Sequence, residues 1–219
     1  MKKRILVLFM ACILALSMSA AVFATGVSKV TINALYREPD IEVNVPSAGQ
    51  MYLNPKSLPM VVDGKVENKQ IINTPWSIEN QSEVAISVNA KIYATINRKS
   101  SMTLSSSSLA ASTTRTKRAF IYLDKRVTDP GVDLSTLDWD QSVYDGNVQL
   151  LVTEAGRERN NFLTLAGTDE NGNALPGSVG AFRLNGDAVT NPREEWNPAV
   201  DNIAVHITFT FRPTAAPAA

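Results

Sequence analysis

The sequence predicts an all-β protein, an antiparallel β-sandwich of the Ig-like, Greek-key type. Apolar residues recur at every second position over long stretches, and clusters of Gly, Pro, Asn and Asp separate these stretches. Few segments have the periodicity of an α-helix, so the sequence offers few of the helices that usually connect the strands of a parallel sheet. With 219 residues, 44% of them hydrophobic, the chain is long enough to bury a substantial core.

The two clearest strands lie in the middle and at the end of the chain. From Val84 to Ile96 the even positions are apolar and the odd positions are mostly polar. In the last strand the odd positions are apolar, namely Ile203, Val205, Ile207, Phe209 and Phe211. A period of two places one face of each strand in a core and leaves the other face toward solvent.

Shorter strands and a few helical turns fill the rest of the chain. Shorter strands are predicted at 27–33, 41–45, 50–54, 76–79, 119–123, 148–153, 162–166 and 179–184. Asn191 followed by Pro192 and two acids predicts one helical turn over 191–196, and a second turn is expected over 134–139. The Ser/Thr-rich stretch 100–116 is predicted to be a long polar loop within one domain.

The first 24 residues have the pattern of a secretory signal peptide. Three basic residues precede an apolar run from Ile5 to Leu16, and small residues then lead to a cleavage site after Ala24. This divides the chain into a signal peptide (1–24), a sandwich domain (25–212) and a disordered Pro/Ala tail (213–219). We therefore expect a secreted or extracellular protein, associated with the cell surface, with no membrane span after cleavage.

Composition excludes several classes of protein. Lys and Arg together number 21, as do Asp and Glu, so the formal net charge is zero and a basic nucleic-acid-binding surface is not expected. The only cysteine, Cys12, lies within the predicted signal peptide. The secreted part would therefore have no disulfide and no cysteine nucleophile, a pattern that suits a bacterial envelope.

No catalytic or metal-binding constellation is evident, and we predict that the protein is not an enzyme. His206, the only histidine, falls on the polar face of the last strand, where an exposed structural role is expected. One histidine without cysteines does not supply a zinc site. The acid-rich segments 129–145 and 169–173 are the only candidates for calcium, and a plain hairpin turn is the preferred interpretation of 169–173.

Two tryptophans in loops are the candidates for ligand contacts. Trp139 and Trp196 lie among Asp, Glu and Pro, so they are expected to be more exposed than Trp76, which begins a strand. The sequence is compatible with two roles for their rings, stacking on sugars and packing within the loops. The basic segment 115–118 is predicted to be a solvated strand entry, with polyanion binding as the alternative.

Several stretches resemble known secreted proteins. They are 41–49 running into 52–55, 76–80 before the long alternating strand, 180–184, and the terminal 209–211. Together they resemble uncharacterised secreted β-sandwich surface proteins of Firmicutes. The element at 78–80 followed by an alternating strand is also similar to TasA/camelysin-type biofilm fibre proteins. That second likeness implies a Gram-positive sandwich subunit that polymerises by completing the sheet of its neighbour, with no catalytic residues.

Two functional hypotheses follow. The first is a secreted, non-catalytic subunit of a cell surface, extracellular matrix or filament that contacts itself or other surface proteins. Its assembly strands would contain Val27, Val30 and Ile32 near the start, or Ile203, Val205, Ile207, Phe209 and Phe211 at the end. The alternative is a carbohydrate-binding module for cell-wall or host glycans that uses Trp139 and Trp196, assisted by calcium.

Overall fold

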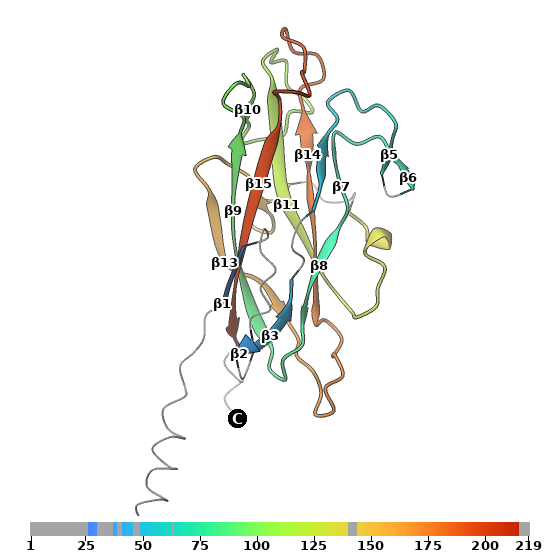
Figure 1. The fold of residues 1–219 in the computed structure, drawn as a ribbon, viewed down its shortest axis with the longest axis vertical. Coiled ribbons are helices and arrows are strands. Elements are labelled where there is room, and N and C mark those ends of the chain that lie inside the picture. The colour runs from blue at the N-terminus through green and yellow to red at the C-terminus, as the bar shows by residue number, and fades with distance from the viewer. Residues whose placement is uncertain are drawn as a thin grey trace, which may run out of the picture.

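The computed structural model describes residues 26–29, 37–38, 41–45, 49–62, 64–139 and 144–214. Figure 1 shows an elongated molecule in which long strands run nearly parallel to the long axis. Within the described residues, the chain forms an antiparallel β-sandwich, as predicted, and no helix is long and apolar enough to cross a membrane. The predicted signal peptide lies outside the described residues.

One layer is a four-stranded sheet with the order β1-β15-β9-β13. Its members are β1 (Gly26–Lys29), β15 (Ile203–Pro213), β9 (Ile86–Ile96) and β13 (Arg157–Leu165). The last strand pairs with β9 along its whole length, from Ile203 opposite Ile96 to Pro213 opposite Ile86. The two strands with the clearest alternation in the sequence are therefore neighbours at the centre of this layer.

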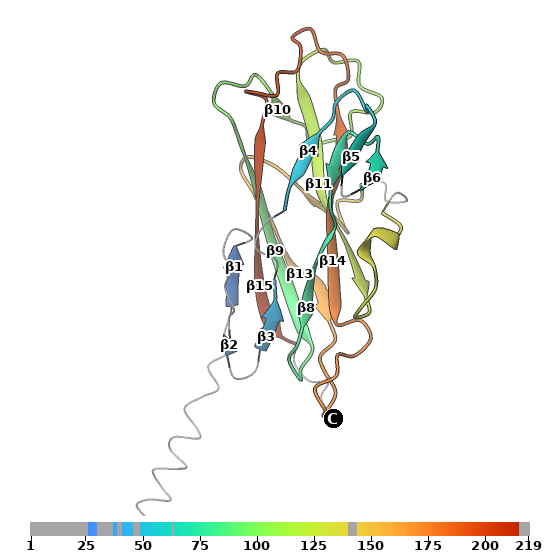
Figure 2. The same cartoon turned by 45° about the vertical axis from the view of Figure 1, so that its right-hand side comes forward.

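The second layer is a seven-stranded sheet. Its members are β10 (Thr103–Leu104), β11 (Arg118–Thr128), β14 (Val179–Ala188), β8 (Trp76–Asn80), β3 (Ile41–Asn44), β2 (Arg37–Glu38) and β12 (Leu150–Leu151), which pairs with β11. The pairing of β10 with β11 is parallel, whereas the other strand pairs of the two layers are antiparallel. Figure 2 shows the two layers facing each other, with the long strands of both layers running along the length of the molecule.

Two small hairpin-like pairs lie beside the sandwich. They are β4 (Met51–Leu53) with β7 (Ile71–Asn73), and β5 (Met60–Val62) with β6 (Lys65–Glu67). The sequence pattern did not predict β2, β5, β6, β7 or β10, all of which have two or three residues. So short a strand does not establish a period of two, and its pairing depends on partners elsewhere in the chain.

A single large apolar cluster fills the space between the two sheets. On β9 the even residues from Ile86 to Ala94 are buried, and on β15 Ile207, Phe209 and Phe211 are buried. Phe182 of β14 lies among the aromatic side chains of this cluster, and its ring centroid is 4.9 Å from that of Phe209. The face predicted to be apolar on each long strand is thus the face that packs into the core.

The two predicted helical turns have different outcomes. Within 134–139 a short 3-10 helix, η1 (Leu134–Thr136), forms, with the Asp133 side chain accepting a hydrogen bond from the Ser135 N–H. The turn predicted over 191–196 is wrong, because this segment contains no helix. Its backbone bonds to another loop instead: the Arg193 N–H donates to the Arg115 carbonyl oxygen at 2.8 Å.

The long Ser/Thr-rich loop is present but is attached to the sandwich. Apart from β10 it has no regular secondary structure. Met102, Ser105 and Leu109 are nevertheless buried. At the other end of the domain, β15 includes Pro213, and Thr214 donates its N–H to the Ala85 carbonyl oxygen at 2.8 Å, so both residues belong to the folded domain rather than to the predicted tail.

Candidate functional site

The first candidate site is the strand edge formed by β1 and β15. These strands pair antiparallel over four residues, from Gly26 opposite Phe211 to Lys29 opposite Thr208, and Val27 stands opposite Thr210. In the described part of the chain, the Ile203–Ile207 half of β15 pairs only with β9. The remaining candidates on the first strand, Val30 and Ile32, lie outside the described residues.

The apolar side chains of β15 are used in the core. Ile207, Phe209 and Phe211 are at most 4% exposed, and Ile203 and Val205 are partly buried against the same cluster. What this strand offers to a partner is therefore its backbone edge and not its apolar side chains.

The opposite edge of the four-stranded sheet, strand β13, is irregular. The register against β9 shifts between Arg159 and Leu163, and Asn161 within the shift has a left-handed φ of 52°. Arg157 and Glu158 on the same strand are exposed. Bulges and charged residues of this kind oppose the addition of another strand, so β15 presents the more regular edge.

Trp139 does not lie at the surface, contrary to the sequence-based expectation. It is 3% exposed, and its Nε1–H donates to the Leu134 carbonyl oxygen at 2.9 Å. The Arg126 guanidinium lies over the ring, 5.5 Å from its centroid. The η1 turn and β11 thus enclose this indole, which leaves too little accessible ring for a sugar to stack on.

Trp196 is half-buried and packs against the core of the sandwich. Its Nε1–H donates to the Val189 carbonyl oxygen at 2.8 Å. The indole anchors the loop between β14 and β15 to the residue that follows β14. Of the two tryptophans proposed for ligand contacts, neither presents a free ring nitrogen.

A shallow groove lies instead on the outer face of the four-stranded sheet. Its volume is about 340 Å³, and it is lined by Asn89, Ala90, Lys91, Tyr93, Glu158, Thr208 and Thr210. Lys91 stands opposite Glu158 on one side and Thr208 on the other, so a row of polar side chains crosses three strands. The period of two in the sequence already indicated that this face is polar. The pairing of the strands, which the local sequence does not specify, brings the polar side chains of the three strands together.

His206 lies on this outer face, the polar face predicted for the last strand, but it is partly buried rather than exposed. Its ring stacks on that of Tyr93, and its Nε2 lies 3.3 Å from the Thr95 hydroxyl. The histidine is therefore engaged in a cross-strand contact between β9 and β15.

The acidic segments do not converge on a metal site in the described part of the chain. There, no three Asp, Glu, His or Cys side chains form a group able to hold a metal ion. Asp169 accepts hydrogen bonds from the N–H groups of Asn171 and Asn173, within a turn closed by the Thr168–Ala174 bridge. The hydrogen bonds from Asn173, the larger influence, and from Asn171 lower the pKa of the Asp169 carboxyl. This agrees with the preferred interpretation of 169–173 as a hairpin turn.

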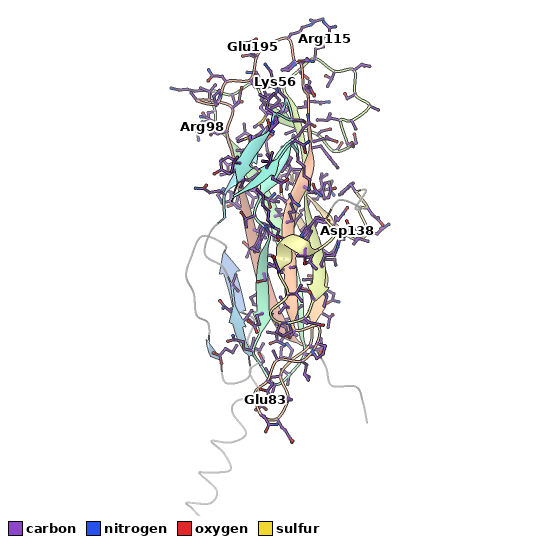
Figure 3. The ribbon with its side chains drawn as sticks, turned by 90° about the vertical axis from the view of Figure 1, so that its right-hand side faces the viewer. Lys56, Glu83, Arg98, Arg115, Asp138 and Glu195 are labelled. Atoms are coloured by element: carbon purple, nitrogen blue, oxygen red, sulfur yellow. The ribbon has the colours of Figure 1, made fainter. Side chains whose placement is uncertain are left out.

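A buried ion pair occupies one end of the sandwich. Lys117 Nζ lies 2.8 Å from Asp201 Oδ2, and both side chains are 2% exposed. Glu194 Oε1 lies 3.4 Å from the same ammonium group, on a side chain that is 68% exposed. Figure 3 labels Arg115 and Glu195 at this end, where their loops come together.

The segment 115–118 is a solvated strand entry at Arg115, Thr116 and Arg118, which are exposed, but Lys117 is an exception. Its ammonium group is buried because Asp201, in the loop that leads into β15, folds over it. The side-chain hydrogen bond to Asp201 raises the pKa of Lys117 against the lowering effect of burial. The sequence gives no local sign of this pair, since 84 positions separate its members.

Three hydrogen bonds fix the Asp201 carboxyl. It accepts from the Ser100 hydroxyl at 2.6 Å, from the Asn197 N–H at 2.7 Å and from Lys117. Burial raises the pKa of Asp201, but the backbone hydrogen bond from Asn197 and the bonds from Lys117 and Ser100 outweigh burial and lower it overall. The carboxyl is thus held in one orientation beside the lysine.

Glu194 is held by the Ser/Thr-rich loop. Its Oε2 accepts from the Ser101 hydroxyl at 2.5 Å, a bond that lowers the pKa of Glu194 together with the nearby charge of Lys117. Neighbouring serines of one loop therefore orient the two carboxyl groups that face Lys117. The cluster leaves no signal in the local sequence, because its residues come from three separate segments.

Comparison of the chain with protein-family models, with curated proteins and with solved structures gives no match. The resemblances to secreted Firmicutes surface proteins and to TasA/camelysin-type proteins therefore stay expectations. The strand edge, the outer groove and the buried cluster are the features from which a function can be argued.

Proposed function

We propose that the protein is a secreted, non-catalytic subunit of a cell surface, extracellular matrix or filament, and that it acts through protein–protein contacts. The observation that carries this proposal is the β1–β15 edge. In the part of the chain that the structure describes, the four residues of β1 pair with only four of the eleven residues of β15 on this side. An uncovered strand edge carries unpaired N–H and C=O groups and is a template for a strand from another molecule.

Strand exchange at this edge would keep the core side chains of the other three strands in place. Among the residues whose side chains the structure describes, those that the four-stranded sheet gives to the core come from β9, β13 and β15, and a neighbour's segment in place of β1 would remove none of these. If the register of Lys29 opposite Thr208 continued in a donated strand, Val30 would stand opposite Ile207 and Ile32 opposite Val205. The alternating segment 27–33 has the length and pattern that such a role needs.

The engagement of the histidine supports a non-catalytic role. The His206 ring stacks on Tyr93 and contacts the Thr95 hydroxyl, rather than pairing with a carboxylate and a nucleophile as in acyl-transfer catalysis.

Deletion of residues 26–33 tests strand exchange. We expect the full chain to form oligomers or fibres, seen by size-exclusion chromatography and negative-stain microscopy, and the deletion variant to stay monomeric. A synthetic peptide of residues 26–33 should bind the deletion variant. Deletion of 215–219 is the matched control and should leave assembly unchanged. Assembly of the 26–33 deletion variant at the level of the full chain would overturn the proposal.

Glycan binding is the second candidate function, and the outer groove favours it. The groove combines a tyrosine with hydroxyl, amide, amine and carboxylate groups on an open sheet face, a combination that suits the stacking and hydrogen bonding of sugars. Because Trp139 is buried, the site for this function would be centred on Tyr93 and Lys91.

Calorimetric titration with a panel of cell-wall and host glycans, with and without calcium, tests this second function. Tyr93→Ala and Lys91→Ala should abolish any binding, whereas Trp139→Phe should leave it unchanged. Binding that survives both groove substitutions would exclude the groove as the site, and absence of binding to the whole panel would remove this candidate.

A further inference from the structure

The buried cluster has the composition of a reactive site as well as that of an ion pair. A primary amine and a carboxyl group lie in contact, at 2.8 Å, and both are almost completely withdrawn from water. A second carboxyl group lies 3.4 Å from the amine nitrogen. An amine, a carboxyl group and a proton acceptor in contact are the three components that amide formation between side chains requires.

We propose that Lys117 and Asp201 join in an intramolecular amide bond, with Glu194 as the group that transfers the proton. This modification is independent of the function proposed above. The bond would connect the residue before β11, in one sheet, with the residues before β15, in the other. The two layers of the sandwich would then be linked covalently at one end.

The chemical step balances without any further reactant. The Lys117 ammonium passes one proton to Asp201 Oδ2, which gives a neutral amine beside a neutral carboxylic acid. The amine nitrogen attacks Cγ of Asp201, Glu194 accepts the second nitrogen proton, and the same proton then goes to the departing hydroxyl group. One C–N bond forms, one C–O bond breaks, and one water molecule leaves.

Hydrogen bonds keep the ion pair as the resting form, but burial lowers the cost of reaching the neutral pair that this step needs. Two charges withdrawn from water lose their hydration, which narrows the free-energy gap between the ion pair and the neutral amine and acid. Fixing the two groups in contact also removes the entropic cost of bringing them together, which corresponds to effective molarities of roughly 10⁵–10⁸ M in well-oriented systems.

The donors around Asp201 suit the transition state. The Ser100 hydroxyl and the Asn197 N–H both donate to the carboxyl oxygens, at 2.6 and 2.7 Å. Oδ2 becomes the departing hydroxyl group, so the negative charge that develops as the amine attacks Cγ falls on Oδ1. The Ser100 hydroxyl donates to Oδ1 and stabilises this charge, whereas the Asn197 N–H holds Oδ2 in place. Glu194 is largely exposed, so the water produced has a route to solvent on that side.

The absence of thiols in the predicted secreted chain gives such a bond a physical role. Cys12 lies in the predicted signal peptide, so no disulfide would restrain the secreted domain. A side-chain amide between positions 84 residues apart restrains the unfolded chain in the way that a disulfide with a long loop does. Unlike a disulfide, it does not respond to reductants.

Mass spectrometry of the denatured chain, produced in a secreting bacterial host, tests the proposal. The wild type should be lighter than its sequence by one water molecule, and Lys117→Arg should have the full mass of its sequence. Asp201→Asn should lose ammonia and reach the same final mass as the wild type. Tryptic digestion should give one branched peptide that contains both Lys117 and Asp201.

Glu194→Gln removes the proposed proton acceptor without disturbing the fold. Because the Glu194 side chain is exposed, the variant should have the circular dichroism spectrum of the wild type. It should retain the full mass of its sequence, whereas Glu195→Gln, the matched control, should lose water as the wild type does. A wild-type chain with the full mass of its sequence, cleaved by trypsin after Lys117, would show a simple ion pair and overturn the proposal.

Discussion

Tyr93 of β9 and His206 of β15 stand directly opposite each other, and their rings stack with centroids 4.6 Å apart and planes inclined by 16°. The pair lies on the outer face of the four-stranded sheet, beside the groove that contains Lys91 and Thr208. Cross-strand contacts of this kind stabilise the pairing of the two strands on which they lie. The outer face is therefore ordered by side-chain contacts of its own.

Replacement of Tyr93 and His206 by alanine should reveal a favourable coupling. In a double-mutant cycle followed by urea denaturation, we expect the two substitutions to be non-additive by about 0.2–1 kcal/mol, the usual range for cross-strand pairs. Strict additivity would mean that the stacked geometry contributes nothing to the free energy of unfolding. Thr208→Ala paired with Tyr93→Ala is the control, because Thr208 stands opposite Lys91 instead.

Phe182→Ala should be among the most destabilising substitutions. The Phe182 ring is fully buried and contacts the rings of Trp76, Phe162 and Phe209. Removing such a ring leaves a cavity and lowers the free energy of unfolding by about 3–5 kcal/mol. Val127→Ala on β11, where the side chain is half-exposed, should change it by no more than about 0.5 kcal/mol. Similar urea midpoints for the two variants would contradict the position assigned to Phe182.

Gly186→Ala should destabilise the protein more than Gly172→Ala. Both glycines have a positive φ, 146° and 80°. A β-carbon at position 172 would meet open space, so its cost is the backbone strain alone, about 1–2 kcal/mol. A β-carbon at position 186 would overlap the Phe120 carbonyl oxygen on the neighbouring strand. Thermal unfolding of the two variants under identical conditions gives the comparison, and equal losses would contradict the close approach of β14 and β11.

Asp169→Asn should alter the acid side of the stability profile. Because hydrogen bonds lower the pKa of Asp169 in the folded state, its contribution is present above the pKa of the unfolded chain and is lost as the pH falls through the folded-state pKa. The stability difference between wild type and variant should thus be largest near neutral pH and shrink below about pH 4. Urea denaturation at several pH values measures it.

The sequence was sufficient to predict the parts of the fold that depend on local alternation. The even positions of β9 and the odd positions of β15 face the core and are buried or partly buried, because an apolar face long enough to span the core leaves a regular pattern. Two-residue strands such as β10 leave no such pattern. Their existence depends on a partner strand, as β10 depends on β11.

The candidate sites were less predictable because they depend on contacts between distant segments. Trp139 looked exposed among acidic residues, yet the η1 turn supplies a carbonyl partner for its ring nitrogen and Arg126 covers the ring. Lys117 looked solvated within a basic segment, yet Asp201 and Glu194 reach it from the loops before β15. For Lys117 the partners come from a distant segment, and no spacing rule connects the two. For Trp139 the carbonyl partner is only five residues away, but the polar composition of the segment does not show that the ring turns inward against β11.

The position of Gly26 beside the end of β15 has a mechanical consequence. Gly26 pairs with Phe211 at the end of the ladder from which β15 leads out of the domain. A force applied at Gly26 and Pro213 would therefore load the β1–β15 ladder like a zipper, and its hydrogen bonds would break one after another rather than all together. Under tension β1 would detach first, while the eleven paired positions between β15 and β9 hold the rest of the sheet. A stretched chain would expose the β15 edge before it unfolds, and tension itself would then control whether that edge is open to a neighbour.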